Sequence, residues 1–139
     1  MATVAPFNWQ VRVYYEDTDA GGVVYHSQYL NFMERARTEW LRNLGFEQTY
    51  LRDELDVMIV VCNAQLDFKK PAKFNDLLTI TSEIVKIGRS SFEVAQTITI
   101  ESVTAASTIL VQGLVKVACV NPHTFRPVAI PKEILLKLE

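Results

Sequence analysis

The stretch YEDTDAGGVVYH, from Tyr15 to His26, joins two segments with different hydrophobic periods. Before it, apolar and polar residues alternate, the two-residue repeat of a half-buried strand, which predicts a strand over about Asn8–Glu16. After it, the repeat is close to 3.6 residues and predicts a helix over about Ser27–Leu44. The positions on that helical repeat are Leu30, Met33, Ala36, Arg37, Trp40, Leu41 and Leu44. The stretch is therefore predicted to be a strand-to-helix junction.

Such a junction can support chemistry on a carbonyl group. The pair Gly21-Gly22 lets the backbone turn tightly or approach a ligand closely, and unpaired N–H groups at a helix start can face an oxygen with partial negative charge. A carboxylate in the same loop can then attack the carbonyl or activate a water. The residues alone equally fit an ordinary N-cap and an ordinary glycine turn. They leave both interpretations open.

The chain resembles the 4-hydroxybenzoyl-CoA thioesterase family over nearly its whole length. The matching signature reads Tyr15-x-Asp17-Thr18-Asp19-x-x-Gly22-x-Val24-Tyr25-His26-x-x-Tyr29, then Glu34-Arg35-Ala36-Arg37. Further matches are Pro71-Ala72-x-x-x-Asp76-x-Leu78, Val120-Asn121-Pro122, Pro127 and Pro131. The resemblance implies an α+β hotdog fold, in which a curved antiparallel sheet wraps a long central helix. Within the family, the chain is most similar to the branch of acyl-CoA thioesterases associated with the bacterial Tol-Pal envelope system.

The resemblance also assigns roles within the signature. The second Asp of Asp-x-Asp-x-x-Gly, here Asp19, is the family's catalytic carboxylate, and the backbone N–H of His26 matches the amide that polarises the thioester carbonyl. Whether Asp19 acts as nucleophile or general base stays open, as does any part for the His26 imidazole. Asp17 is expected to hold the loop by accepting hydrogen bonds from backbone N–H groups. Glu16 is expected to make a surface or strand-end interaction. The candidate substrate-binding residues are Tyr15, Gly22, Val24, Tyr25 and Tyr29, of which the tyrosines could instead pack beneath the site.

These assignments imply hydrolysis of an acyl-CoA thioester to a free acid and coenzyme A. Two alternatives are a non-catalytic module that binds acyl-CoA or acyl carrier protein, and a hotdog hydratase or dehydratase. Acyl carrier protein is a further candidate partner of the enzyme. No metal or organic cofactor is expected. A calcium-binding EF-hand loop counted from Asp17 would have Gln28 in place of its last acidic ligand. A zinc site is not indicated either, because His26 and His123 are far apart in the sequence.

Contacts to the coenzyme phosphates are expected from exposed loops. The resemblance to the family implies that Arg89 and Ser90 make these contacts, often to a coenzyme that lies across a dimer interface. Lys70 and Lys73 are weaker candidates. We therefore expect at least a homodimer, or a homotetramer, in which the loop near Val57–Val61 of one subunit approaches Asp19 of the other.

Length and composition indicate one globular domain over residues 1–139, with 49% hydrophobic and 22% charged residues. The net charge of −2 gives no general attraction to nucleic acid or anionic lipid. Met1–Gln10 lacks a secretory pattern, and no apolar stretch is long enough to span a membrane, so a cytoplasmic protein is expected. Cys62 and Cys119 lie in apolar segments and are predicted to be reduced and buried.

The remaining elements follow from periodicity. The predicted segments are a short helix at Phe46–Leu55, strands at Val60–Phe68, Leu77–Ile87, Phe92–Glu101 and Thr108–Val120, and turns at Gly88–Ser91 and Ser102–Ser107. The first of these strands alternates as though one face were buried. The last strand is apolar on both faces, as in a central or intersubunit strand.

Overall fold

The computed structural model describes residues 5–101 and 107–139. The elements are β1 (Phe7–Arg12), the 3-10 turn η1 (Tyr15–Asp17), α1 (His26–Asn43), α2 (Gln48–Glu54), β2 (Met58–Phe68), β3 (Leu77–Ile87), β4 (Ser91–Ile100), β5 (Thr108–Val120) and α3 (Lys132–Leu138). The predicted limits of β3 and β5 are confirmed to the residue, and those of α1 to within one residue. Helix α3 was missed, although its buried Ile134 and Leu138 have helical spacing.

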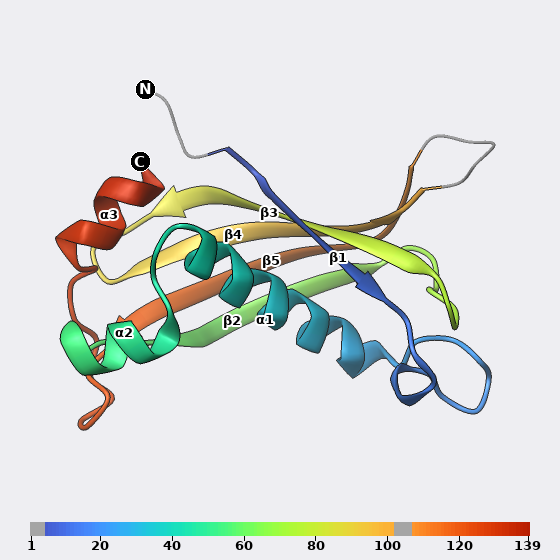
Figure 1. The fold of residues 1–139 in the computed structure, drawn as a ribbon, viewed down its shortest axis with the longest axis horizontal. Coiled ribbons are helices and arrows are strands. Elements are labelled where there is room, and N and C mark those ends of the chain that lie inside the picture. The colour runs from blue at the N-terminus through green and yellow to red at the C-terminus, as the bar shows by residue number, and fades with distance from the viewer. Residues whose placement is uncertain (1–4, 102–106) are drawn as a thin grey trace.

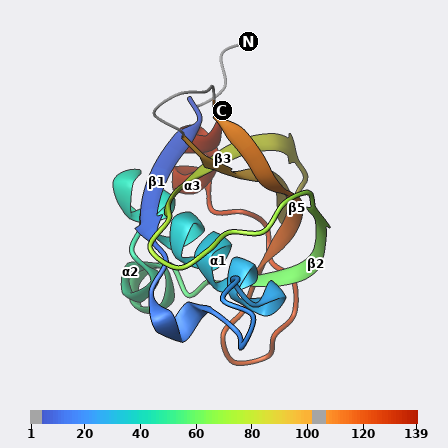
Figure 2. The ribbon, with the colours of Figure 1, turned by 90° about the vertical axis from the view of Figure 1, so that its right-hand side faces the viewer.

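The five strands form one antiparallel sheet in the order β1-β3-β4-β5-β2. The sheet curves around α1, which runs along its concave face (Figures 1 and 2). Helices α2 and α3 lie at one end of the sheet, and the loop between β1 and α1 lies at the other (Figure 1). This arrangement confirms the predicted α+β class.

The inner face of α1 supplies much of the core. Its buried residues are Tyr29, Phe32, Met33, Ala36, Trp40 and Leu41. Leu30 lies on the predicted helical repeat but outside the core, because its side chain is 42% exposed. Tyr29 takes the inward position, and each residue step turns the helix by about 100°, which carries Leu30 toward solvent.

Met33 of α1 packs against the sheet at Gly113 of β5. A Cβ atom added there would lie 2.9 Å from Met33 Cε and 3.2 Å from Met33 Sδ. Glycine thus leaves the space that the Met33 side chain fills, and the central helix can approach the sheet at this point.

The first strand is shorter than predicted. It ends at Arg12, and Tyr15–Asp17 turns as a 3-10 helix, so Glu16 does not continue the strand alternation. The backbone bends because the N–H of Tyr14 turns to the Asp17 carboxylate, at 2.9 Å, and not to a neighbouring strand.

Strand β2 contradicts its predicted buried face. None of its residues is buried, and Val61 and Phe68 are each 50% exposed. The reason is position, because β2 is an edge strand paired only with β5. Cys62 is consequently exposed, against the prediction, whereas Cys119 is buried as predicted. The predicted turn at Ser102–Ser107 falls almost wholly outside the described residues.

Candidate active site

Asp17 anchors the loop between β1 and α1 from inside. Its side chain is buried, Oδ2 accepts the N–H of Tyr14 at 2.9 Å, and Oδ1 accepts Nε2 of Gln28 at 2.8 Å. The backbone oxygen of Asp17 accepts the N–H of Tyr25 at 3.1 Å. These bonds connect the loop to both of its ends, which is the loop-holding role predicted for Asp17.

Asp19 lies two residues further on, and its side chain is exposed. Its Oδ1 accepts the N–H of Gly21 at 2.8 Å, and no other hydrogen bond to its carboxylate occurs within residues 5–101 and 107–139. The loop closes through Asp19 N–H to Val23 O, at 2.9 Å, and Gly22 N–H to Asp19 O, at 3.0 Å. Gly22 has a φ of +82°, a conformation that glycine adopts without strain. The turn therefore presents a carboxylate to solvent.

Helix α1 begins at His26, and Tyr25 precedes it in an extended conformation. The N–H of His26 is in the first helical turn, where no acceptor exists within the helix. In the described part of the chain it donates to no protein group. The positive end of the helix dipole lies at the same place, so this N–H can receive an oxygen that gains negative charge. The His26 ring is exposed and lies 4.3 Å from the Tyr25 ring.

A segment distant in sequence forms the second wall of the site. The carbonyl of Ala72 accepts the N–H of Val24 at 2.9 Å, and Val23 bridges to Lys73. The N–H of Ala72 donates to the Tyr29 hydroxyl at 3.0 Å. The segment and the helix start enclose an open hollow, which His26, Tyr29, Phe68, Lys69, Lys70 and Pro71 help to line.

The predicted substrate-binding residues separate into distinct settings. Val24 and Tyr29 are buried beside the hollow, and Tyr25 is half exposed. Tyr15 is 77% exposed and stacks on Phe74 with ring centroids 3.9 Å apart, away from the hollow. Phe68 lines the hollow but was missed, because the pairing of Val24 with Ala72 brings this part of the chain to the helix start. No local pattern in the sequence indicates that pairing.

Arg89 and Ser90 lie in the turn between β3 and β4, at the end of the sheet opposite the Asp19 loop (Figure 1). Ser90 O accepts the N–H of Cys119 at 2.7 Å, and Arg89 O accepts that of Ile130 at 2.8 Å, which ties the turn to the end that carries α3. One chain therefore does not bring Arg89 and Asp19 together.

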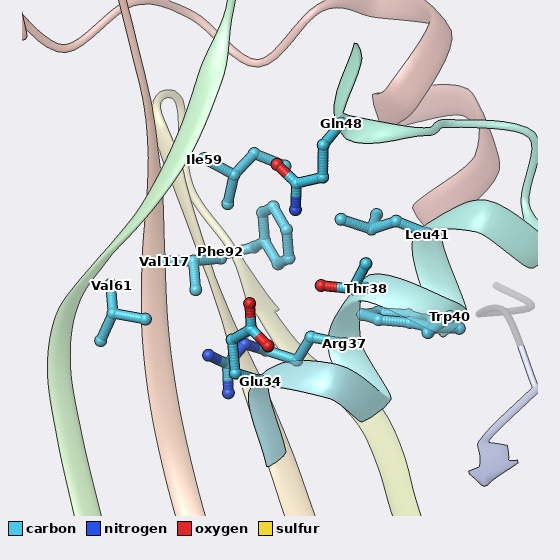
Figure 3. A pocket seen from close by; sticks show the side chains of 10 residues that line it. All are labelled: Glu34, Arg37, Thr38, Trp40, Leu41, Gln48, Ile59, Val61, Phe92 and Val117. Carbon is cyan, nitrogen blue, oxygen red and sulfur yellow. The ribbon is translucent and has the colours of Figure 1, made fainter. Parts of the chain in front are cut away.

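A separate cavity lies between α1 and the sheet, with Glu34 and Arg37 reaching into it from the helix (Figure 3). Within the described ranges, no cluster of three or more His, Cys, Asp or Glu side chains could hold a metal ion. None of the helices that the structure describes is long and apolar enough to cross a membrane.

The model of the thioesterase superfamily matches residues 21–106, more than half of the chain. The chain belongs to the thioesterase superfamily. It is 45% identical over 129 residues to the acyl-CoA thioesterase YbgC of Haemophilus influenzae, covering 92% of this chain and 90% of that protein. It is 44% identical over 133 residues to the acyl-CoA thioester hydrolase YbgC of Escherichia coli O6:H1, covering 96% of each.

The fold is shared with more distant members of the superfamily. A mutant 4-hydroxybenzoyl-CoA thioesterase, solved in complex with 4-hydroxybenzoyl-CoA, superposes with a TM-score of 0.91 at 15% identity over 96% of this chain and 99% of that one. Together these matches confirm the predicted family and the hotdog fold. They identify this thioesterase superfamily member as a thioester hydrolase.

Proposed function

We propose that this protein hydrolyses acyl-CoA thioesters, with Asp19 as the catalytic carboxylate and the His26 N–H as the group that polarises the carbonyl. The relatives with 44–45% identity are named for acyl-CoA thioester hydrolysis. The observation that carries the site assignment is the His26 N–H, which opens α1 without a protein acceptor in the described chain. Asp19 supports it, because its exposed carboxylate lies in the loop that leads into the same helix.

The reaction needs a negative charge to develop on the thioester oxygen. With that oxygen on the His26 N–H, the charge would be stabilised by a fixed dipole that needs no reorganisation. Asp19 would then either attack the carbonyl carbon, expelling coenzyme A as its thiol and leaving a mixed anhydride for water to cleave, or remove a proton from the attacking water. Both routes consume one water and release one carboxylic acid.

Release of free thiol from acyl-CoA tests the activity, and a panel of acetyl-, malonyl-, butyryl-, benzoyl- and palmitoyl-CoA would define the acyl preference. A single turnover in ¹⁸O-water separates the two routes. A nucleophilic Asp19 gains label during hydrolysis of the anhydride, whereas a general base does not. Wild-type protein that releases no thiol from any of these substrates would refute the proposal.

We also propose a homodimer, or a pair of such dimers, with sites shared between subunits. Strand β2 leaves an unpaired edge that invites pairing with a second copy. If two β2 strands paired antiparallel, the Asp19 end of one sheet would lie beside the Arg89 end of the other. Arg89 and Ser90 could then contact the coenzyme phosphates of the neighbouring site, as could Lys70 and Lys73 beside the hollow. The segment Val57–Val61, predicted to be a loop, lies in β2 from Met58 onward, and this end of the strand would approach the partner's site in the same arrangement.

Further proposals concern the setting of the enzyme in the cell. The enzyme would act in the cytoplasm, without a metal or organic cofactor, in association with the Tol-Pal envelope system. Acyl carrier protein would be an additional partner, as the carrier of a thioester-linked acyl group. Hydrolysis of acyl carrier protein thioesters, measured beside the matching acyl-CoA, tests that partner directly.

A further inference from the structure

The cavity of Figure 3 lies under the C-terminal half of α1, several turns beyond His26. Its volume is about 90 Å³, which is the space of roughly three water molecules in the liquid. Apolar side chains form the wall on the sheet side, among them Ile59, Phe92 and Val117. A molecule that fits it is small and has an apolar surface.

The polar side of the cavity carries Arg37, which forms no ion pair with the residues that the structure describes. Arg37 is partly buried, and its Nη1 donates to Gln96 Oε1 at 2.8 Å. Gln96 is in turn fixed, because its Nε2 donates to Ser82 Oγ and to the Met33 carbonyl, at 2.9 and 3.0 Å. The amide is neutral, and no carboxylate in residues 5–101 and 107–139 lies within 4.0 Å of the Arg37 guanidinium.

Arg37 shares the cavity with one acidic side chain, that of Glu34. Desolvation lowers the pKa of Arg37, and the negative charge of Glu34 only partly opposes this effect. Glu34 reaches toward the same cavity, but its side chain is exposed to water and makes no ion pair with Arg37 in the described structure. A guanidinium has five N–H donors, so several remain for a ligand.

Trp40, which also lines the cavity, carries an unpaired donor in the described structure. The Trp40 side chain lines the cavity and is 1% exposed, and its indole Nε1 is buried without a hydrogen-bond partner in the described structure. A buried unpaired donor costs about 1–3 kcal/mol. Native proteins rarely leave such groups without a partner.

We propose that the cavity binds a short-chain carboxylate, with its oxygens on the Arg37 guanidinium and its apolar carbons against Ile59, Phe92 and Val117. A carboxylate matches the planar donor fork of arginine and balances its charge, which water alone does not do. The acids that thioester hydrolysis releases belong to this chemical class, so the cavity would hold product; that last step rests on the proposed function.

Titration with sodium propionate tests the site without any measurement of activity. In a Trp9→Phe background, the remaining tryptophan is Trp40, and its fluorescence reports on the cavity directly. We expect a saturable change with propionate at constant ionic strength, and about tenfold weaker binding or worse for propionamide, which keeps the shape but not the charge. Sodium chloride at the same ionic strength serves as the blank.

Variants of two neighbouring arginines complete the test. Arg37→Gln should weaken propionate binding about tenfold or more, whereas Arg35→Gln, at an exposed position of the same helix, should leave it unchanged. Absence of a saturable signal, or equal affinity for propionate and propionamide, would overturn the proposal even if Arg37→Gln fails to fold. Because these are binding measurements, loss of the site and loss of thioesterase activity are distinguished.

Discussion

The hydroxyl of Tyr29 accepts a hydrogen bond from the backbone N–H of Ala72 at 3.0 Å, and so connects α1 to the segment that faces the Asp19 loop. The carbonyl of Ala72 continues the connection by accepting the N–H of Val24, two residues before His26. Desolvation by burial raises the pKa of the Tyr29 hydroxyl above its ordinary value. Tyr29 thus holds the backbone that leads into the helix start.

Tyr29→Phe should lower kcat about tenfold with little change in KM, because the ring stays in place but the Ala72 and Val24 backbone loosens beside His26. The free energy of unfolding should fall by about 1–3 kcal/mol, the cost of leaving a buried N–H unpaired. Steady-state kinetics and denaturant unfolding measure the two effects. Tyr50→Phe is the matched control, since it removes a hydroxyl bonded to Glu133 in another part of the molecule. An unchanged kcat in Tyr29→Phe would show that the contact is only structural.

The two aspartates of the loop should respond differently to removal. Asp19→Ala should reduce kcat by roughly 10²–10⁴-fold, since the chemical step loses its carboxylate, and leave the unfolding midpoint nearly unchanged. Asp17→Ala should instead destabilise the fold by about 1–3 kcal/mol, because two donors lose their buried acceptor. Its effect on kcat should be the smaller one. Near wild-type turnover in Asp19→Ala would refute the assignment of the catalytic acid.

Gly113→Ala should destabilise the protein by about 1–3 kcal/mol, because the new Cβ would lie 2.9 Å from Met33 Cε in a filled core. In a Met33→Ala background the same substitution should cost much less, since the opposing methyl group is gone. The coupling between the two sites is measured by a double-mutant cycle in urea. Strictly additive effects would mean that helix and sheet do not compete for this space.

The two cysteines should differ in reactivity. Burial raises the pKa of Cys119 from 9.0 to about 11, so its thiolate is scarce at pH 8, whereas Cys62 is exposed. Iodoacetamide should therefore modify at most one cysteine per folded chain, and Cys62→Ser should abolish the reaction. The folded state keeps the Cys119 proton longer than the unfolded state, so this group's contribution to stability is complete below about pH 9 and is lost as pH rises toward 11. Modification of Cys119 before unfolding would contradict its burial.

The assembly should depend on the edge strand β2. Ala64→Lys puts a charge on this exposed edge and should shift the protein toward monomer, whereas Val85→Lys, on the exposed side of an inner strand, should not. Sedimentation at low micromolar concentration compares the two variants. A wild-type species that is fully active at the monomer mass of 15.8 kDa would exclude both the dimer and the shared site.

The sequence predicted the elements whose signal is local. The Thr- and Ile-rich run before the Gly88 turn defined β3, and the long apolar run defined β5. The helical repeat defined α1. The errors have a common physical origin in tertiary context. The alternation in β2 could not reveal that this strand forms the sheet edge, so Cys62 was placed inside. Likewise, Phe68 joined the candidate site through the pairing of Val24 with Ala72, which no short motif encodes.

Asp17 and Asp19 are two residues apart, yet the first holds the loop and the second only accepts one N–H from within it. Because the two aspartates differ in this way, the charge of Asp19 can be removed without disturbing the loop. Asp19→Asn would keep the N–H contact to Gly21 while losing the negative charge, so the chain should fold and still admit its ligand. Purified from its host, such a variant could retain an intact thioester, and mass spectrometry of the retained molecule would name the natural acyl group.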